Sequence, residues 1–213
     1  MDRFKALRGV AQFALLGGTF DPVHNGHLET ARQILHRTGV NKVVFLPSGT
    51  PPHKSFFHVT DGEQRLRMVE LAVEGEEGLA VSDLEVHRAG MTYTVDTVEE
   101  LHRELGDGVQ FHFVLGADAL FYLSSWKNYE RLLELCSMIA VTRPGYDTSR
   151  LKAAIGRLKE KYHSRIRFLE IPPVNISSSE IRQKVKRGES IQGLVPKAVE
   201  EYIAKTGLYQ AGD

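Results

Sequence analysis

Short apolar runs alternate along this chain with segments whose apolar residues recur at helical spacing. Phe13–Leu16 precedes a helical pattern that begins near Leu28, and Val43–Leu46 precedes another near Leu66. Further strand-like segments lie at 79–86, 111–115, 138–141 and 166–171. A continuous apolar run is typical of a strand that helices cover on both faces of a parallel sheet. The alternation therefore predicts an α/β fold, a doubly wound Rossmann-like parallel sheet with helices on both faces.

We expect a single domain over residues 1–213, with a core at 12–175 and a helical C-terminal segment at 176–213. The chain has 213 residues, of which 42% are hydrophobic, and this is enough to bury a substantial core. No apolar stretch approaches membrane-spanning length, and the charged N-terminus lacks a signal-peptide core. These features favour a cytoplasmic protein. Residues before Gln12 receive no role.

Charge and cysteine content narrow the class of partner. Lys and Arg together number 27 and balance 27 Asp and Glu, so no global field draws the chain to nucleic acid or to a membrane. Any anion site must be local. Cys136 is the single cysteine, which excludes an internal disulfide and a multi-cysteine zinc site.

The run GGTFDPVHNGH follows the first apolar segment and carries the strongest chemical signal. Gly17 and Gly18 have no Cβ, so an anion can approach their backbone N–H groups closely. His24 and His27 lie three residues apart at a helix start, where exposed N–H groups also favour anions. Gly26 between them leaves room for a phosphate chain. Either histidine alone could instead cap the helix or pack in the core.

A second motif lies near the C-terminus, in the run NISSSEIR. Ser177 and Glu180 match a capping box, which explains those two residues structurally. It does not explain the neighbouring serines or Arg182, whose guanidinium suits phosphate. A helix start with Ile176, Ser177, Ser178 and Arg182 could therefore bind a triphosphate. Both interpretations can hold together.

Two further loops follow predicted strands and are candidates because ligands bind at the carboxyl ends of such strands. Lys54 lies on a loop stiffened by prolines, where it could neutralise phosphate, although a solvated lysine is the simpler interpretation. Gly116 and Asp118 form a small-residue turn whose carboxylate could accept hydrogen bonds from ribose hydroxyls. An ordinary helix cap explains this turn equally well.

The two motifs together resemble the signatures of the HxGH nucleotidyltransferase superfamily, as His24–His27 and Ile176–Arg182. Over nearly its whole length the chain is similar to the bacterial nicotinate mononucleotide adenylyltransferases. The shared segments are GGTFDPVHNGH, Pro51–Lys54, Tyr93–Thr97, Gly116–Asp118, Trp126, Arg143–Gly145 and Gly207–Tyr209. The chain departs from that pattern at Met91 and Thr92, which replace the frequent Pro and Ser, and at Lys127, where an aromatic residue is frequent.

This resemblance implies adenylyl transfer from ATP to nicotinate mononucleotide, giving nicotinate adenine dinucleotide and pyrophosphate in NAD biosynthesis. It implies Mg²⁺ carried in with ATP, no metal site of the protein's own, and no nucleic-acid or membrane partner. The implied catalytic residues are His24, His27, Lys54 and Arg182. The implied ATP contacts are Gly17, Gly18, Thr19, Phe20, Gly26, Gly116, Asp118, Ile176, Ser177 and Ser178. The implied contacts to the pyridine substrate are Thr94, Trp126 and Lys127.

Other functions stay open from the residues alone. A metal-dependent phosphohydrolase could use His24 and His27 as ligands, with Asp21 or Asp118 completing the set. A non-catalytic nucleotide sensor is a second alternative, because a fold does not fix a function. Within the superfamily, phosphopantetheine or nicotinamide mononucleotide could be the acceptor. The sequence leaves open the strictness for nicotinate, the oligomeric state and whether the 48–61 loop closes over substrates.

Overall fold

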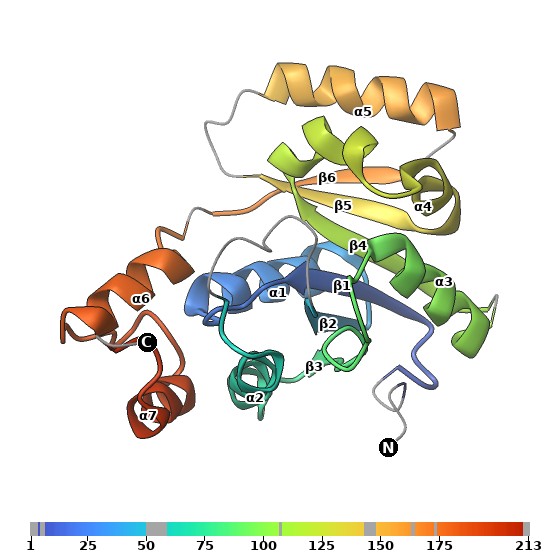
Figure 1. The fold of residues 1–213 in the computed structure, drawn as a ribbon. Helices are drawn as coiled ribbons and strands as arrows, with labels where there is room; N and C mark the ends of the chain where they lie inside the picture. Colours follow the sequence, from blue (N-terminus) through green and yellow to red (C-terminus); the bar gives the residue numbers. More distant parts are fainter. Residues whose placement is uncertain are drawn as a thin grey trace.

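The structure is a computed structural model that describes residues 4, 7–49, 59–106, 108–142, 148–162, 165–172 and 174–210. Its centre is a six-stranded sheet with the order β3-β2-β1-β4-β5-β6, and every neighbouring pair is parallel (Figure 1). The strands are β1 (Gln12–Gly18), β2 (Lys42–Pro47), β3 (Leu79–Val81), β4 (Gln110–Gly116), β5 (Ser137–Thr142) and β6 (Ile166–Glu170).

Helices cover both faces of this sheet. They are α1 (Asn25–Thr38), α2 (Gly62–Val73), α3 (Thr94–Leu105), the 3-10 helix η1 (Ala117–Ser125), α4 (Tyr129–Leu135), α5 (Thr148–Tyr162), α6 (Ser178–Lys186) and α7 (Lys197–Thr206). Successive side chains of β1 point to opposite faces, so Ala14 and Leu16 pack with α1, α2, α6 and α7. Phe13 and Leu15 pack with α3, η1, α4 and α5. The continuous apolar runs thus reflect two buried faces, and the predicted fold class is confirmed.

The strand expected at 79–86 is shorter than predicted. Only Leu79–Val81 pair with β2, and turns follow in the next residues. Ser82 begins the change, because its hydroxyl oxygen accepts the N–H of Leu84 and turns the chain off the edge of the sheet. This early exit matters because it places Glu85 inward, near the carboxyl end of β2, where it lines a cavity.

The chain before Gln12 also has a place in the core. Phe4 and Leu7 are buried in the same cluster as Phe13 and Leu15, beneath the α3 side of the sheet. This N-terminal segment therefore adds apolar burial to the domain. Among the described residues, no helix is long and apolar enough to cross a membrane.

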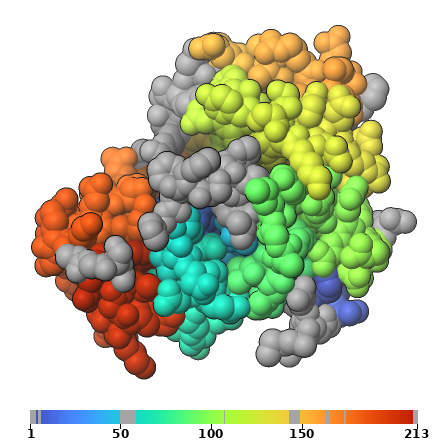
Figure 2. Space-filling model, in the orientation of Figure 1, coloured from blue at the N-terminus to red at the C-terminus, as the bar shows by residue number. Residues whose placement is uncertain are grey.

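The C-terminal helices α6 and α7 form a lobe beside α2. Figure 2 shows this lobe, orange to red, against the cyan surface of α2. Ile181 of α6 and Val199 and Ile203 of α7 belong to the same apolar cluster as α1 and α2. The lobe is thereby fixed against the face of the sheet that carries α1, and the start of α6 lies near the loop that follows β1.

Candidate active site

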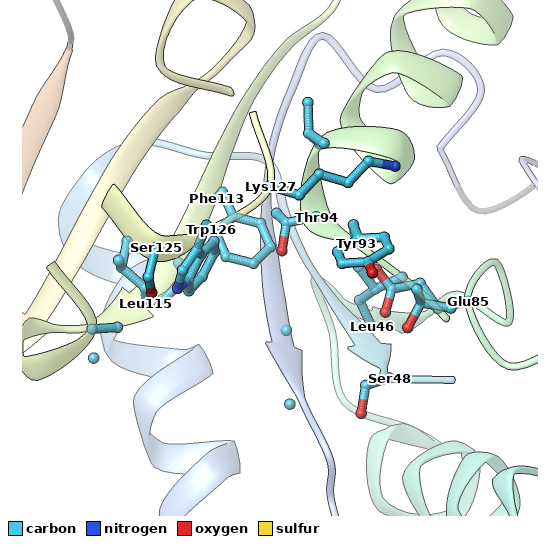
Figure 3. A pocket seen from close by; sticks show the side chains of 17 residues that line it. Leu46, Ser48, Glu85, Tyr93, Thr94, Phe113, Leu115, Ser125, Trp126 and Lys127 are labelled. Carbon is cyan, nitrogen blue, oxygen red and sulfur yellow. The ribbon is translucent and has the colours of Figure 1, made fainter. Parts of the chain in front are cut away.

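The sheet order places a crevice between β1 and β4. β1 continues into α1 on one face of the sheet, and β4 continues into η1 on the other. Loops that diverge in this way leave an opening at the carboxyl ends of the two strands, where α/β proteins bind ligands. A cavity of about 520 Å³ lies there (Figure 3). From the predicted site residues it brings together Gly17, Gly18, Thr94, Gly116, Trp126 and Lys127.

His24 and His27 lie at the start of α1, beside this crevice. His24 occupies the N-cap position and is buried, and His27 is half-buried on the first turn. Their rings stack with centroids 3.7 Å apart and planes 23° apart. The backbone N–H of His24 donates to Nδ1 of His27 at 3.2 Å. Because Nδ1 accepts, a neutral His27 carries its proton on Nε2, where it can donate to a ligand.

Burial decides the charge of the two histidines. It lowers the pKa of His24 from 6.5 to about 4. Burial also lowers the pKa of His27 to about 3, and repulsion from a charged His24 lowers it further in the same direction. Both rings are therefore uncharged at neutral pH, and each offers one N–H donor rather than a positive charge. An anion bound beside them would favour the protonated forms.

Glycines at the end of β1 and in the first turn of α1 have a steric role that the sequence did not reveal. A Cβ on Gly18 would lie 2.7 Å from the ring of Phe20, and a Cβ on Gly26 would lie 3.0 Å from Nδ1 of His24. A Cβ on Gly17 would lie 3.1 Å from the ring of Phe113, and this contact would also be tight. These glycines therefore let rings lie directly against the backbone, in addition to any access that they give an anion.

Phe20 supports His27 rather than facing a cavity with its side chain. It is 3% exposed, has a φ of 50°, and meets the His27 ring edge to face with centroids 5.0 Å apart. Any contact of Phe20 with ATP would have to use its backbone. Thr19 directs its carbonyl oxygen to Nη1 of Arg65 at 2.8 Å.

The serine motif and the histidine motif meet, although more than 150 residues separate them. Ser177 caps α6 by accepting the N–H of Glu180 at 3.2 Å, which is the serine half of the predicted capping box. Ser178 Oγ donates to the carbonyl of Pro22 at 2.9 Å. Arg182 Nη1 donates to the carbonyl of Asp21 at 2.6 Å. The start of α6 is thus bound to the loop that carries the histidines.

Arg182 also lines a second cavity, of about 760 Å³, on the side of α6 and α2. Its lining includes Thr60, Lys186 and Tyr209. The predicted catalytic residues therefore do not all line one cavity. His24 and His27 lie at the start of α1 and do not line the 520 Å³ cavity, whereas Arg182 contacts the loop before α1 and lines the second cavity. Ile176 is half-buried and packs against the core on the α1 side.

Trp126, Thr94 and Tyr93 line the 520 Å³ cavity. In Figure 3, Thr94 lies between the Trp126 and Tyr93 side chains. Trp126 follows η1 and meets Phe113 edge to face with centroids 6.1 Å apart. Lys127 Nζ pairs with both carboxylate oxygens of Asp96 at 3.0 Å and lies 4.5 Å from the centre of the Tyr93 ring. The cation of Lys127 is thus held at the rim.

Some of the expected site residues do not line the 520 Å³ cavity, and others lie outside the described residues. Asp118 is exposed on η1, one residue beyond the buried Ala117. Lys54 lies outside the described residues, as do Pro51–His53 and Arg143–Gly145. Sequence reasoning missed Ser48, Glu85 and Tyr93 as lining residues. A buried carboxylate such as Glu85 has no local signature, because the turn after β3 that brings it inward depends on the edge of the sheet.

Asp21 does not join a metal site with the histidines. It is 5% exposed, its Oδ1 accepts the hydroxyl of Tyr209 at 2.6 Å, and its Oδ2 accepts the N–H of Thr60 at 3.3 Å. Within the described part of the chain, no group of three His, Cys, Asp or Glu residues could hold a metal ion. The phosphohydrolase alternative therefore finds no ligand set there.

Known proteins are similar to this chain in sequence and in fold. Residues 15–184 match the family model described as cytidylyltransferase-like. A protein of Moorella thermoacetica named probable nicotinate-nucleotide adenylyltransferase is 45% identical, covering 92% of this chain and 90% of its own. A protein of Clostridium tetani with the same name is 40% identical, covering 92% of this chain and 98% of its own.

Solved structures show the same fold. Nicotinic acid mononucleotide adenylyltransferase of Plasmodium falciparum, complexed with NaAD, aligns with a TM-score of 0.76 at 21% identity, over 93% of this chain and 97% of that one. The resemblance drawn from the two motifs is confirmed by the sequence relatives. The chain belongs to the cytidylyltransferase-like family and, within it, to the nicotinate-nucleotide adenylyltransferases.

Proposed function

We propose that the chain transfers the adenylyl group of ATP to nicotinate mononucleotide, forming nicotinate adenine dinucleotide and releasing pyrophosphate. Membership of the nicotinate-nucleotide adenylyltransferases supports the reaction. The observation that carries the site assignment is the junction of the two motifs, where Ser178 and Arg182 bind the loop that leads into His24 and His27. Through that junction, residues 12–175 and the segment 176–213 act as one catalytic domain.

The phosphate chain of ATP lies between the start of α1 and the start of α6 in this proposal. His24 and His27 each donate an N–H. The Ser177 hydroxyl, whose oxygen accepts from Glu180, keeps its proton for phosphate, and Ser178, whose hydroxyl donates to Pro22, adds its backbone N–H at the start of α6. Arg182 has five N–H donors, so the two that it uses for Asp21 and Ser179 leave others for phosphate. Lys54 adds a further cation. The N–H groups at the helix starts and these side chains suit a polyanion.

The other ATP contacts follow the two strands that flank the crevice. Gly17 and Gly18 border the cavity at the end of β1, and Gly116 borders it at the end of β4. Thr19, Phe20, Gly26 and Ile176 would contribute backbone groups or packing around the nucleotide. Asp118, exposed two residues after Gly116, would accept hydrogen bonds from the ribose hydroxyls.

Nicotinate mononucleotide occupies the 520 Å³ cavity with its pyridine ring beside Trp126. This volume lies in the usual range for small-molecule sites, about 300–1,000 Å³. Thr94 begins α3, so its backbone N–H is among those at a helix start that can receive the nicotinate carboxylate. Lys127 at the rim adds a positive charge, shared with Asp96. An amide in place of the carboxylate would lose this attraction.

The reaction needs placement more than proton transfer. A phosphate monoester has a second pKa of about 6, so the acceptor is largely a dianion at neutral pH and needs no protein base. One of its oxygens attacks the α-phosphorus of ATP in line, and the bond from that phosphorus to the bridging oxygen of the β-phosphate breaks. The electron pair leaves with pyrophosphate. No covalent intermediate with the protein forms.

The histidines stabilise the charge that develops on the transferring phosphate. Mg²⁺ bound to the phosphates of ATP would neutralise part of their charge. Because both rings are neutral before ATP binds, the site does not carry two repelling cations when empty.

The acceptor is tested by the release of pyrophosphate. With ATP and Mg²⁺ present, nicotinate mononucleotide, nicotinamide mononucleotide and phosphopantetheine are supplied separately at equal concentrations. We expect fast release with the nicotinate compound and much slower release with the other two, because only it places a carboxylate beside Thr94 and Lys127. Equal rates with nicotinamide mononucleotide would refute the assigned contacts, and no release with any acceptor would refute the transferase function.

The role of His24 is tested by substitution. We expect His24→Ala to lower kcat by about 10²- to 10³-fold, the usual loss when one donor to a transition-state oxyanion is removed. His36→Ala is the matched control, because His36 is exposed at the far end of the same helix. A folded His24→Ala protein with the turnover of the His36→Ala control would contradict the role.

The charge of the histidines is tested by NMR titration. In the free chain, the imidazole signals of His24 and His27 should stay those of neutral rings until the pH falls to about 4 and about 3. A non-hydrolysable ATP analogue should raise both pKa values, because its negative charge favours the protonated rings. Titration of either ring near 6.5 in the free chain, or no change with saturating analogue, would contradict this.

A further inference from the structure

One buried guanidinium donates hydrogen bonds to backbone carbonyls of the two loops that are assigned to the phosphates of ATP. Arg65 lies in the first turn of α2 and is 2% exposed. Its Nη1 donates to the carbonyl of Thr19 at 2.8 Å, its Nε to that of Thr60 at 2.8 Å, and its Nη2 to that of Gly49 at 3.3 Å. The three carbonyls belong to the histidine loop and to the two ends of the loop that carries Lys54.

The charge of Arg65 is unusual in this position. Burial lowers its pKa, and the carboxylates of Asp21 and Asp61 act in the opposite direction. Its guanidinium donates hydrogen bonds to three backbone carbonyls, so its planar donors position the backbone rather than form a close ion pair. A buried charge is costly, and an apolar residue would fill the same space more cheaply. Its presence is explained by the three carbonyls that it fixes.

Gly49 is held from its other side as well. A Cβ on Gly49 would lie 2.2 Å from the carbonyl oxygen of Glu85, so the two backbones are in close contact. The N–H of Gly49 donates to the Glu85 carboxylate, which also accepts the hydroxyl of Thr97 at 2.7 Å. Thr97 lies on α3, one turn after Thr94. A continuous set of contacts thus joins Arg65 to the helix that borders the acceptor cavity.

Thr60 is fixed in the same way. Its carbonyl accepts from Arg65, and its N–H donates to the carboxylate of Asp21, three residues before His24. Tyr209 donates to the other oxygen of that carboxylate. The loop of the histidines and the end of the 49–60 loop are therefore linked twice, once through each side of the Thr60 backbone.

We propose that Arg65 is a positioning residue for adenylyl transfer, which fixes the histidine loop relative to the loop that carries Lys54. This inference rests on the proposed function, because the histidines and Lys54 are both assigned there to the phosphates of ATP. A misplacement of about 1 Å between reacting groups can cost about 10²-fold in rate without loss of binding. Loss of the guanidinium should therefore affect kcat more than KM.

The test compares Arg65→Lys with Arg67→Lys. Both keep the positive charge on α2, but Arg67 is exposed and pairs with Glu70, so it is the matched control. At a temperature at which circular dichroism shows both proteins folded, we expect Arg65→Lys to lower kcat by about 10- to 100-fold. The KM values for ATP and nicotinate mononucleotide should change by less than about threefold, since the binding groups remain. A kcat equal to that of the Arg67→Lys control would overturn the proposal.

A second readout separates positioning from general stability. In a Lys54→Ala background, Arg65→Lys should cost less than in the wild type, because it acts in part through the loop of Lys54. If the two substitutions lowered kcat independently, so that their fold losses multiplied in the double variant, the link between Arg65 and Lys54 would be overturned. Should Arg65→Lys not fold, Thr97→Val loosens the same contacts through Glu85 and should lower kcat with KM retained. Unchanged kcat in that variant would overturn the proposal.

Failure of the function itself is recognised separately. A wild-type protein that releases no pyrophosphate refutes the transferase reaction before any variant is compared. Amide hydrogen exchange still tests the clamp, because Arg65→Lys should speed exchange in residues 17–28 and 59–62 and leave β5 unchanged. Exchange equal to that of Arg67→Lys in those segments would overturn the clamp whatever the activity.

Discussion

The reversal of strand order at β1 is the constraint on which the site depends, because β2 and β3 are added on one side of β1 and β4, β5 and β6 on the other. β1 lies between β2 and β4, and the connections run outward from it in opposite directions. Its side chains are buried on both faces, so helices must cover both, and α1 and η1 leave the sheet on opposite sides. The crevice between them needs no special residue to open it. The particular sequence adds the polar side chains of the two motifs and the hydrogen bonds that fix their positions.

Those contacts come from distant parts of the chain. Ser178 and Arg182 bind the carbonyls of Pro22 and Asp21, and Tyr209 binds the Asp21 carboxylate, across more than 150 residues. Burial in the same region keeps His24 and His27 neutral until an anion arrives. Rigid support and low solvent access belong together here, because hydrogen-bond donors act most strongly on developing charge when they are already oriented and water is excluded.

Much of the fold could be predicted from local patterns. Both faces of the central strands are buried, so runs such as Phe13–Leu16 and Val43–Leu46 are apolar throughout and are recognisable without a partner. Ser177 caps α6 as predicted, because a capping box is a local arrangement. The family, the activity and the sheet could be inferred in this way, since their signals lie within single segments.

The rest depends on contacts between segments. An arginine such as Arg65, two residues before Arg67 in a helix with many charges, is indistinguishable in sequence from a solvated one until the fold brings three backbone carbonyls from two loops to its guanidinium. The end of β3 depends on its place at the sheet edge. The lowered pKa values of the histidines depend on burial that no local pattern reports.

The most direct test of the catalytic assignment is a crystal structure of this chain with bound nicotinate adenine dinucleotide. We expect the pyridine ring in the 520 Å³ cavity beside Trp126, and the pyrophosphate bridge within hydrogen-bond distance of His24 or His27. A dinucleotide bound instead in the 760 Å³ cavity beside Arg182 and Lys186, without contact to either histidine, would contradict the assignment.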